Sequence, residues 1–150
     1  MNRKMTSGSQ PRLYIDTNIF LDHLLGRKVK SSQLIREIAN GRFEGFTSHF
    51  TLSELAGVLK ELGVPRGDIN KILIRVQEFP NIQIVFHDYI MFLDMPENIL
   101  NTCVQCRDAL HFMAAKYLAV DKIVTRDKGF KSAIDHIIPC VTPEQLLSET

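Results

Sequence analysis

Short apolar runs alternate along the chain with longer stretches in which apolar residues recur at the i, i+3, i+4 and i+7 spacing of amphipathic helices. The runs at residues 13–15, 45–48, 82–86 and 123–125 are predicted to be β-strands. Because the connections between them are too long for hairpins, the strands are expected to lie mostly parallel, with helices covering both faces of the sheet. This alternation predicts an α/β domain.

Helices are predicted between the strands, and several of their ends carry capping signals. Asp16 stands ahead of the first helix, and Thr142 with Gln145 has the pattern of a capping box at the last. Residues 91–101 give no clear prediction, because Pro96 limits any helix there. The predicted helices are one closing at Gly26, one ending at residues 40–41, one from 51 toward 63, one around 69–76, one from near 107 and a short one from 143.

Length and composition predict one compact domain. A chain of 150 residues, 45% hydrophobic and 23% charged, can bury a core of its own. Residues 1–11 are interpreted as a flexible leader and residues 12–150 as the domain, because Arg3 and Lys4 precede polar residues where a secretory signal needs an apolar core. No apolar stretch approaches the roughly 20 residues that cross a bilayer. The protein is therefore expected to be cytoplasmic, with no membrane partner.

The charge balance gives no overall field that would attract a polyanion, because Lys and Arg number 18 and Asp and Glu number 17. Any contact with RNA is therefore expected to use local basic patches. The candidates lie after the first predicted helix and around the last acidic motif: Arg27, Lys28, Lys30, Arg126 and Lys128. An ordinary solvated surface explains both groups equally well.

The cysteines and histidines give no metal-site pattern. Cys103 and Cys106 form a lone Cys-x-x-Cys motif, and a zinc site would need a second ligand pair that the sequence does not offer. The cysteines are expected to be buried or semi-buried thiols, with a local disulfide as the alternative. No two histidines form a spaced pair on one helix, so all are interpreted as scattered structural or surface residues: His23, His49, His87, His111 and His136.

Four acidic residues stand where an α/β fold can bring them together. Asp16 directly follows a predicted strand and Asp127 follows another by two residues, while Glu54 and Asp108 lie in the first turns of predicted helices. If the two strands are neighbours in a parallel sheet, these carboxylates meet at one edge. Converging carboxylates repel one another unless a cation lies between them. An all-oxygen site suits Mg²⁺ or Mn²⁺, and such a site supports phosphoryl transfer.

Each acid also has a purely structural explanation. Asp16 has the position of a helix cap, Asp127 that of a turn former, and Asp108 that of a favourable negative charge at a helix amino terminus. Glu54 has the position of the acidic member of a capping box with Thr51. Taken singly, none of the four therefore identifies a site.

The segments around the four acids resemble the motifs of the PIN-domain family. The sequence LYIDTNIF at residues 13–20 resembles the first motif, TLSEL at 51–55 the second, DALH at 108–111 the third and VTRDKGF at 124–130 the fourth. Their order and spacing also match, and together they span most of the chain. Four ordered motifs are far more specific than any one alone.

This resemblance implies a three-layer α/β/α sandwich and a Mg²⁺- or Mn²⁺-dependent nuclease, most often acting on RNA and leaving a 5′-phosphate and a 3′-hydroxyl. It implies that Asp16, Asp108 and Asp127 are metal ligands, and that Glu54 is a further ligand or orients the attacking water. The implied supporting residues are Thr17, Asn18 and Thr125. The chain is most similar to the VapC-type ribonuclease toxins, which are usually homodimers inhibited by a small antitoxin whose tail occupies the acidic site.

Three alternatives remain open at the level of sequence. A phosphatase of the haloacid-dehalogenase type also has an Asp after its first strand, but it needs a second Asp two residues later, where this chain has Asn18. A catalytically silent PIN-like module would bind RNA or protein without cleaving, although a silent site has no physical reason to keep like charges together. A housekeeping RNA-processing nuclease would share the chemistry of a toxin and differ only in its role.

Overall fold

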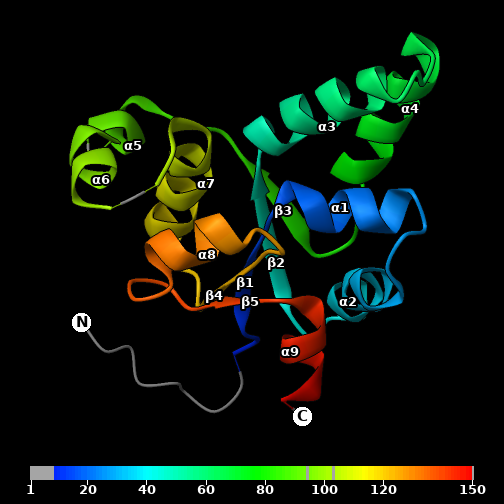
Figure 1. Ribbon diagram of the computed structural model, residues 1–150. Coiled ribbons are helices and arrows are strands. Elements are labelled where there is room, and N and C mark those ends of the chain that lie inside the picture. Colours follow the sequence, from blue (N-terminus) through cyan, green and yellow to red (C-terminus); the bar gives the residue numbers. More distant parts are fainter. Residues whose placement is uncertain (1–8, 94, 103, 150) are drawn as a thin grey trace.

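The computed structural model describes residues 9–93, 95–102 and 104–149, and these residues form one five-stranded sheet with helices on both sides (Figure 1). All neighbouring strands are parallel, in the order β3-β2-β1-β4-β5. The predicted α/β fold with a mostly parallel sheet is therefore confirmed. The strands are β1 (Arg12–Ile15), β2 (Glu44–Ser48), β3 (Ile82–Val85), β4 (Lys122–Val124) and β5 (Cys140–Val141).

The helices lie in two layers, and consecutive residues of the central strand β1 face opposite layers. Tyr14 packs into the core beneath α7 and α8, whereas Leu13 and Ile15 pack into the core beneath α1, α2, α3, α4 and α9. The two cores confirm the three-layer sandwich (Figure 1). The helices are α1 (Thr17–Leu24), α2 (Val29–Ala39), α3 (His49–Glu61), α4 (Arg66–Gln77), α5 (Tyr89–Leu93), α6 (Met95–Asn101), α7 (Cys106–Tyr117), α8 (Lys128–Ile134) and α9 (Pro143–Ser148).

The order of the strands creates one point at which the chain reverses its direction across the sheet. From β1 the chain proceeds to β2 and β3 on one side, and later to β4 and β5 on the other. In parallel α/β sheets, binding sites form at the carboxyl ends of the strands beside such a point. Here that point lies between β1 and β4, where the backbone N–H of Asp16 donates to the carbonyl of Val124 at 3.0 Å. The topology therefore places Asp16 and the segment after β4 at the same edge.

Five elements differ from the sequence-based predictions. Strand β5 has only two residues, Cys140–Val141, and was not predicted. Helix α8 occupies residues where only a turn was expected. Two short helices, α5 and α6, divide the stretch that gave no clear prediction, and α3 begins at His49, two residues before Thr51. By contrast, α9 has the predicted capping box, in which the Thr142 and Gln145 side chains accept from each other's backbone N–H groups.

The cysteine prediction holds at one described position and is wrong at another. Cys140 is buried, but Cys106 is exposed at the first residue of α7. Cys103 lies outside the described residues, as does most of the predicted leader. Within the part of the chain that the structure describes, no helix is long and apolar enough to cross a membrane.

Candidate metal centre

Asp16 is held rigidly at the carboxyl end of β1, where it caps α1. Its Oδ1 accepts from the backbone N–H of Thr17 at 2.7 Å, and its Oδ2 accepts from Thr125 Oγ1 at 2.6 Å and from Asn18 Nδ2 at 3.2 Å. The side chain is buried, with 7% of the residue exposed. The structure thus places all three predicted supporting residues in contact with this carboxylate. Its role as a cap and its place in the acidic cluster do not exclude each other.

Glu54 projects from α3 toward Asp16. Its Oε1 accepts from Thr17 Oγ1 at 2.7 Å and from the imidazole of His111, and its Oε2 pairs with Arg107 at 3.3 Å. The capping-box explanation of Glu54 is wrong, because α3 begins earlier than predicted and places this residue in the second turn. The Thr51 hydroxyl instead bonds the Thr47 hydroxyl at 2.8 Å.

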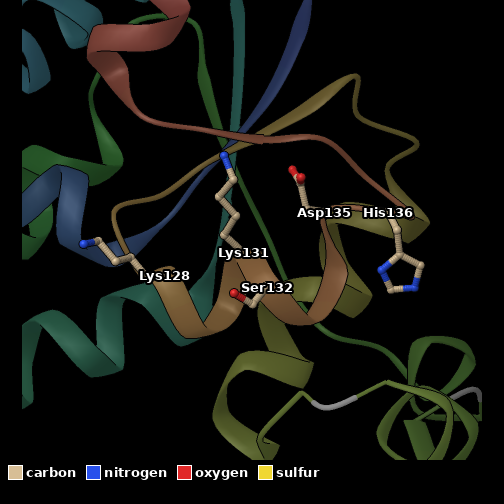
Figure 2. Close-up of a pocket in the computed structure, with 5 residues that line it drawn as sticks. All are labelled: Lys128, Lys131, Ser132, Asp135 and His136. Carbon is tan, nitrogen blue, oxygen red and sulfur yellow. The ribbon is translucent and has the colours of Figure 1, made fainter.

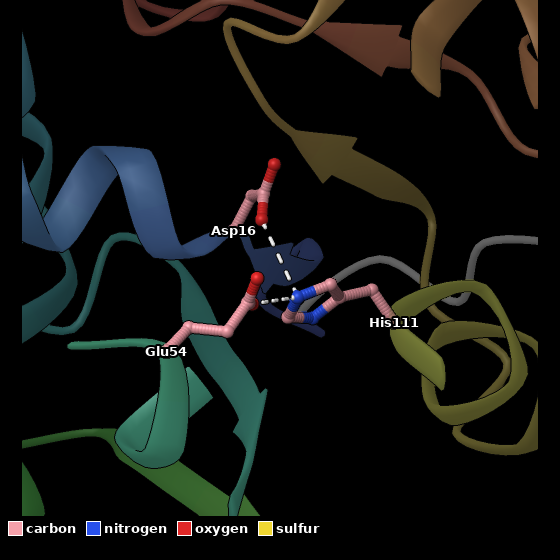
Figure 3. Close-up of side chains that lie close together, drawn as sticks. All are labelled: Asp16, Glu54 and His111. Atoms are coloured by element: carbon pink, nitrogen blue, oxygen red, sulfur yellow. Dashed lines mark hydrogen bonds and ion pairs between the residues drawn. The ribbon is translucent and has the colours of Figure 1, made fainter. Parts of the chain in front are cut away.

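His111 lies inside the acidic cluster, contrary to its interpretation as a scattered residue. It projects from α7 with only 2% of its surface exposed, and its Nε2 contacts Glu54 and lies 3.8 Å from Asp16 Oδ1 (Figure 3). Ligand atoms of these three residues all lie within 4.8 Å of one another. One signal in the sequence could have identified it: His111 follows Asp108 by three residues, and residues at this spacing share a helix face.

Asp108 and Asp127 lie outside the group of ligand atoms that Asp16, Glu54 and His111 form. Asp108 lies in the first turn of α7 as predicted, and Asp127 caps α8 by accepting from the backbone N–H of Phe130 at 3.0 Å. Burial and then the negative charges of Asp127, Asp16 and Glu54 raise the pKa of Asp108 to about 6. Asp108 is therefore influenced electrostatically by the other three predicted acids.

The pKa values of the inner groups follow from burial opposed by pairing. Burial raises the pKa of Asp16, although the His111 imidazole and the Thr125 hydroxyl act against it. Burial also acts to raise the pKa of Glu54, but hydrogen bonds from His111 and Thr17 outweigh it and leave the pKa lowered. For His111, burial acts to lower the pKa, and the bond to Glu54 with the neighbouring carboxylates raises it instead. One buried imidazole thus partly offsets the charge of the carboxylates around it.

The chemistry of the donor atoms fits a divalent cation. A carboxylate oxygen of Asp16, which follows β1, one of Glu54 on α3 and a ring nitrogen of His111 on α7 lie within 4.8 Å of one another, whereas Asp108 and Asp127 are not part of this group. Hard oxygen ligands of this kind are typical of Mg²⁺ and Mn²⁺ sites, and an imidazole nitrogen is compatible with Mn²⁺. The cluster at Asp16 and Glu54 is therefore a candidate metal site.

The predicted basic patches divide into one engaged arginine and several exposed side chains. Arg126 donates to Asp22 Oδ2 at 2.7 Å, to both carboxylate oxygens of Glu144 at 2.8 and 2.9 Å, and to Ser31 Oγ at 3.0 Å. Its guanidinium is thus engaged within the protein, and its assignment to RNA binding stays a prediction. The remaining predicted basic residues are exposed: Arg27, Lys28, Lys30 and Lys128.

Lys128 also lines a cavity of about 490 Å³ on α8 and the turn that follows it (Figure 2). The other residues that line it are Lys131, Ser132, Asp135 and His136. The four predicted acids are not among these residues, so the cavity is distinct from the acidic cluster. One of its two lysines, Lys128, directly follows Asp127 in the sequence.

The fold and the cluster together define a class of protein: an all-parallel α/β domain with carboxylates gathered at the carboxyl ends of its central strands. The sequence then identifies the family. A model of the PIN domain matches residues 13–135, so the chain belongs to the PIN-domain family, whose members are typically nucleases. Compared with curated proteins, the sequence matches none.

Solved structures of similar fold come from toxin–antitoxin systems. A toxin–antitoxin complex from Klebsiella pneumoniae is 17% identical with a TM-score of 0.64, over 87% of this chain and 97% of that one. VapBC2 from Rickettsia felis, bound to a DNA fragment from its promoter, is 13% identical with a TM-score of 0.69, over 87% and 98%. VapC20 from Mycobacterium tuberculosis, a toxin that cleaves the sarcin–ricin loop, is 14% identical with a TM-score of 0.61, over 80% and 93%. At these identities the likeness establishes the fold.

Proposed function

We propose that the protein is a divalent-metal-dependent endoribonuclease, with Asp16, Glu54, Asp108 and Asp127 as its catalytic and metal-binding residues. The observation that supports the proposal is the buried cluster of Asp16, Glu54 and His111, whose ligand atoms lie within 4.8 Å of one another. Like charges held together destabilise a folded protein unless a cation neutralises them. The segments around the four acids also resemble the motifs of the PIN-domain family, to which the chain belongs and whose members are typically nucleases.

Different residues of the chain would have different roles at such a site. Thr17, Asn18 and Thr125 fix both oxygens of Asp16, so this ligand is oriented before a cation binds. Asp108 and Asp127 are more exposed than Asp16 and would therefore be more accessible to RNA. Bound Mg²⁺ or Mn²⁺ would supply Lewis-acid stabilisation of the phosphate and lower the pKa of the attacking water.

The role we propose is that of a toxin paired with a small antitoxin. The support is the similarity of the fold to structures that are themselves toxins or toxin–antitoxin complexes. An antitoxin segment that fills the acidic site would need positive charge to complement the four carboxylates. A homodimer is part of the same proposal, and sedimentation of the purified protein tests it directly.

The first experiment is RNA cleavage by the purified protein with Mn²⁺, with Mg²⁺ and with EDTA, alongside an Asp16→Asn variant. We expect metal-dependent cleavage that EDTA abolishes and that Asp16→Asn reduces roughly 100-fold or more, because even residues that only support a metal ligand contribute 10- to 100-fold. Asp68→Asn is the matched control, since it makes the same chemical change on α4, where Asp68 pairs with the exposed Lys71. This control is expected to cleave at the wild-type rate.

Intact RNA in every reaction would contradict the nuclease proposal for that substrate, and calorimetry with Mn²⁺ then separates the remaining cases. Binding of Mn²⁺ to the wild type but not to Asp16→Asn would support the proposed metal site and would mean that the RNA tested is not a substrate. Failure to bind would favour a silent module.

The toxin role has its own test, which is growth arrest on induced expression in a bacterial host. Wild-type protein is expected to stop growth and Asp16→Asn is not. Active nuclease that leaves growth unaffected would favour a housekeeping RNA-processing role.

A further inference from the structure

A continuous chain of hydrogen bonds runs from the buried interior of the sheet to the metal centre. Tyr14 Oη on β1 bonds Ser48 Oγ on β2 at 3.0 Å and His111 Nδ1 on α7 at 2.8 Å. His111 Nε2 in turn contacts Glu54 on α3. Tyr14 has no exposed surface and His111 has 2%, so water does not compete for these bonds. Four separate elements thus meet in one buried polar chain behind the acidic cluster.

The direction of the last bond follows from the chemistry of its partners. An ionised carboxylate can only accept, so Nε2 of His111 carries the proton and donates to Glu54. The single proton of the Tyr14 hydroxyl is donated to Ser48 Oγ, so toward His111 the tyrosine oxygen accepts from Nδ1. His111 then donates from both ring nitrogens, to Tyr14 and to Glu54.

The imidazole ring is also fixed by packing. Three aromatic rings surround it: Tyr14 at 5.8 Å between ring centroids, Phe50 at 5.3 Å and Phe130 at 6.4 Å. A ring enclosed in this way has one orientation, and it holds its N–H toward Glu54. Figure 3 shows the imidazole edge turned toward the carboxylates of Asp16 and Glu54.

The two oxygens of Glu54 have different surroundings. Oε1 receives two hydrogen bonds, from His111 and from Thr17. Within the part of the chain that the structure describes, Oε2 pairs with the guanidinium of Arg107, whose side chain is 75% exposed. An exposed arginine moves aside at little cost, so Oε2 is the oxygen available to a cation.

We propose that His111 is a positioning residue, which holds Oε1 of Glu54 so that Oε2 is directed at the metal, and that Tyr14 anchors His111 in this orientation. This inference rests on the proposed metal site and adds to it a supporting pair outside the four acids. It also distinguishes His111 from a direct ligand. Both ring nitrogens already bond protein groups, so coordination through Nε2 would require the Glu54 bond to break.

Two substitutions at position 111 distinguish the contribution of Nε2 of His111 from that of Nδ1. The amide nitrogen of Gln reaches about as far as Nε2, whereas that of Asn lies where Nδ1 lies. We expect His111→Asn, which loses the bond to Glu54, to weaken the binding of Mn²⁺ and of Mg²⁺ about 10- to 100-fold alike. His111→Gln keeps a donor for Glu54, and its loss is expected to stay below about tenfold.

Tyr14→Phe and Ser48→Ala form a matched pair, because each removes one hydroxyl from the same buried chain. Tyr14→Phe frees the ring of His111 and is expected to weaken Mn²⁺ binding by about tenfold. Ser48→Ala leaves the Tyr14–His111 contact in place and should bind Mn²⁺ as the wild type does. Thermal melting of all four variants confirms that each is folded before calorimetry.

One measurement on the unaltered protein removes the dependence on folding of the variants. In the pulsed electron-spin resonance spectrum of bound Mn²⁺, a directly coordinated imidazole gives a strong nitrogen coupling, and we expect none. A strong nitrogen coupling, or equal losses for His111→Asn and His111→Gln, would overturn the positioning role. If the wild type binds no Mn²⁺, the proposed metal site itself fails, and the inference fails with it.

Discussion

The protein contains two clusters of charged side chains that are built in opposite ways. In one, which we call the Arg126 network, the guanidinium of Arg126 is enclosed by the carboxylates of Asp22 and Glu144 and the hydroxyl of Ser31 at distances of 2.7 to 3.0 Å. In the candidate metal centre, Asp16 and Glu54 lie against one buried imidazole, Glu54 also pairs with the exposed Arg107, and the pKa of Asp108 is raised by burial and by the neighbouring acids.

The difference indicates what each cluster does. The Arg126 network satisfies its own charges, and it joins α1, α2 and α9 to the segment after β4. The candidate metal centre has more acidic than basic side chains, and its acids cost stability by their mutual repulsion. A cluster whose charges are balanced within the chain stabilises the fold, whereas an excess of carboxylates is the arrangement expected of the cation site that we propose.

The largest expected effect comes from breaking the complete cluster. Arg126→Met removes the only cation of the network and leaves two carboxylates facing each other. We expect the free energy of unfolding to fall by roughly 3 kcal/mol, the lower end of the range for buried pairs, because the Arg126 side chain is 22% exposed. Urea denaturation measures this, and Mn²⁺ is not expected to restore the loss. A change below about 1 kcal/mol would show that the network is only a surface feature.

The next largest change in the free energy of unfolding is expected when Mn²⁺ binds at the candidate metal centre. Mn²⁺ at 100 times its dissociation constant is expected to raise the free energy of unfolding of the wild type by about 2.7 kcal/mol. Asp16→Asn should lose this gain, whereas Glu144→Gln, which alters the other cluster, should keep it. Urea denaturation with and without the ion provides the measurement. An equal gain in Asp16→Asn would mean that Mn²⁺ binds elsewhere.

A smaller gain in stability is expected when a substitution relieves the repulsion among the acids in the metal-free protein. The pKa of Asp108 is raised to about 6 from its ordinary value of 3.8, so in the metal-free protein its ionised form is destabilising above pH 6. Asp108→Asn should therefore stabilise the metal-free protein at pH 7.5, by about 1 kcal/mol after allowance for partial exposure, or about 3 °C in Tm.

The gain from Asp108→Asn should diminish as the pH falls from 6 toward 4, because the wild-type carboxyl then becomes protonated in the folded protein while it is still largely ionised in the unfolded chain. Melting curves at pH 7.5 and pH 4 test the sign. A variant that is less stable than the wild type at pH 7.5 would contradict the repulsion on which the comparison rests.

The smallest effect is expected at the outer edge of the Arg126 network. The Glu144 side chain is 46% exposed, so Glu144→Gln should lower the free energy of unfolding by less than about 1 kcal/mol. High salt should reduce the difference further, because exposed charges are screened. If the loss instead equals that of Arg126→Met, Glu144 contributes as much as the buried Asp22.

The sequence predicted the centre of the fold better than its periphery. Strand β1 is an unbroken apolar run that ends in Asp16, and a buried parallel strand followed by a cap leaves few alternatives. Strand β5 has two residues and no periodicity to detect. Helix α8 was missed although Phe130, Ala133 and Ile134 have helical spacing, because Asp127 followed by Gly129 also has the pattern of a turn.

The candidate site could be predicted where sequence neighbours determine the contacts, or where a motif resemblance supplied a remote residue such as Thr125, which lies 109 residues from Asp16. Thr17 and Asn18 are adjacent to Asp16, and the motif around them indicated their support. Arg126 was assigned to a basic patch with Lys128, because its partners are remote: Asp22 lies 104 residues away and Glu144 lies 18 away. The same limitation applied to His111, whose partners Tyr14 and Glu54 come from other elements. Ion pairing across the fold has no signature in local sequence.

The position of β5 at the margin of the sheet has a consequence for the order in which the protein is assembled. Until residues 140–141 have been synthesised, β4 is an edge strand with unpaired backbone groups. Until α9 follows, Arg126 also lacks the carboxylate of Glu144. The half of the metal centre that follows β4 is therefore fixed late, after the half formed by β1 and α3 can already have folded. A nascent chain that emerges from the ribosome would thus acquire its complete acidic cluster only after β5 and α9 have been synthesised.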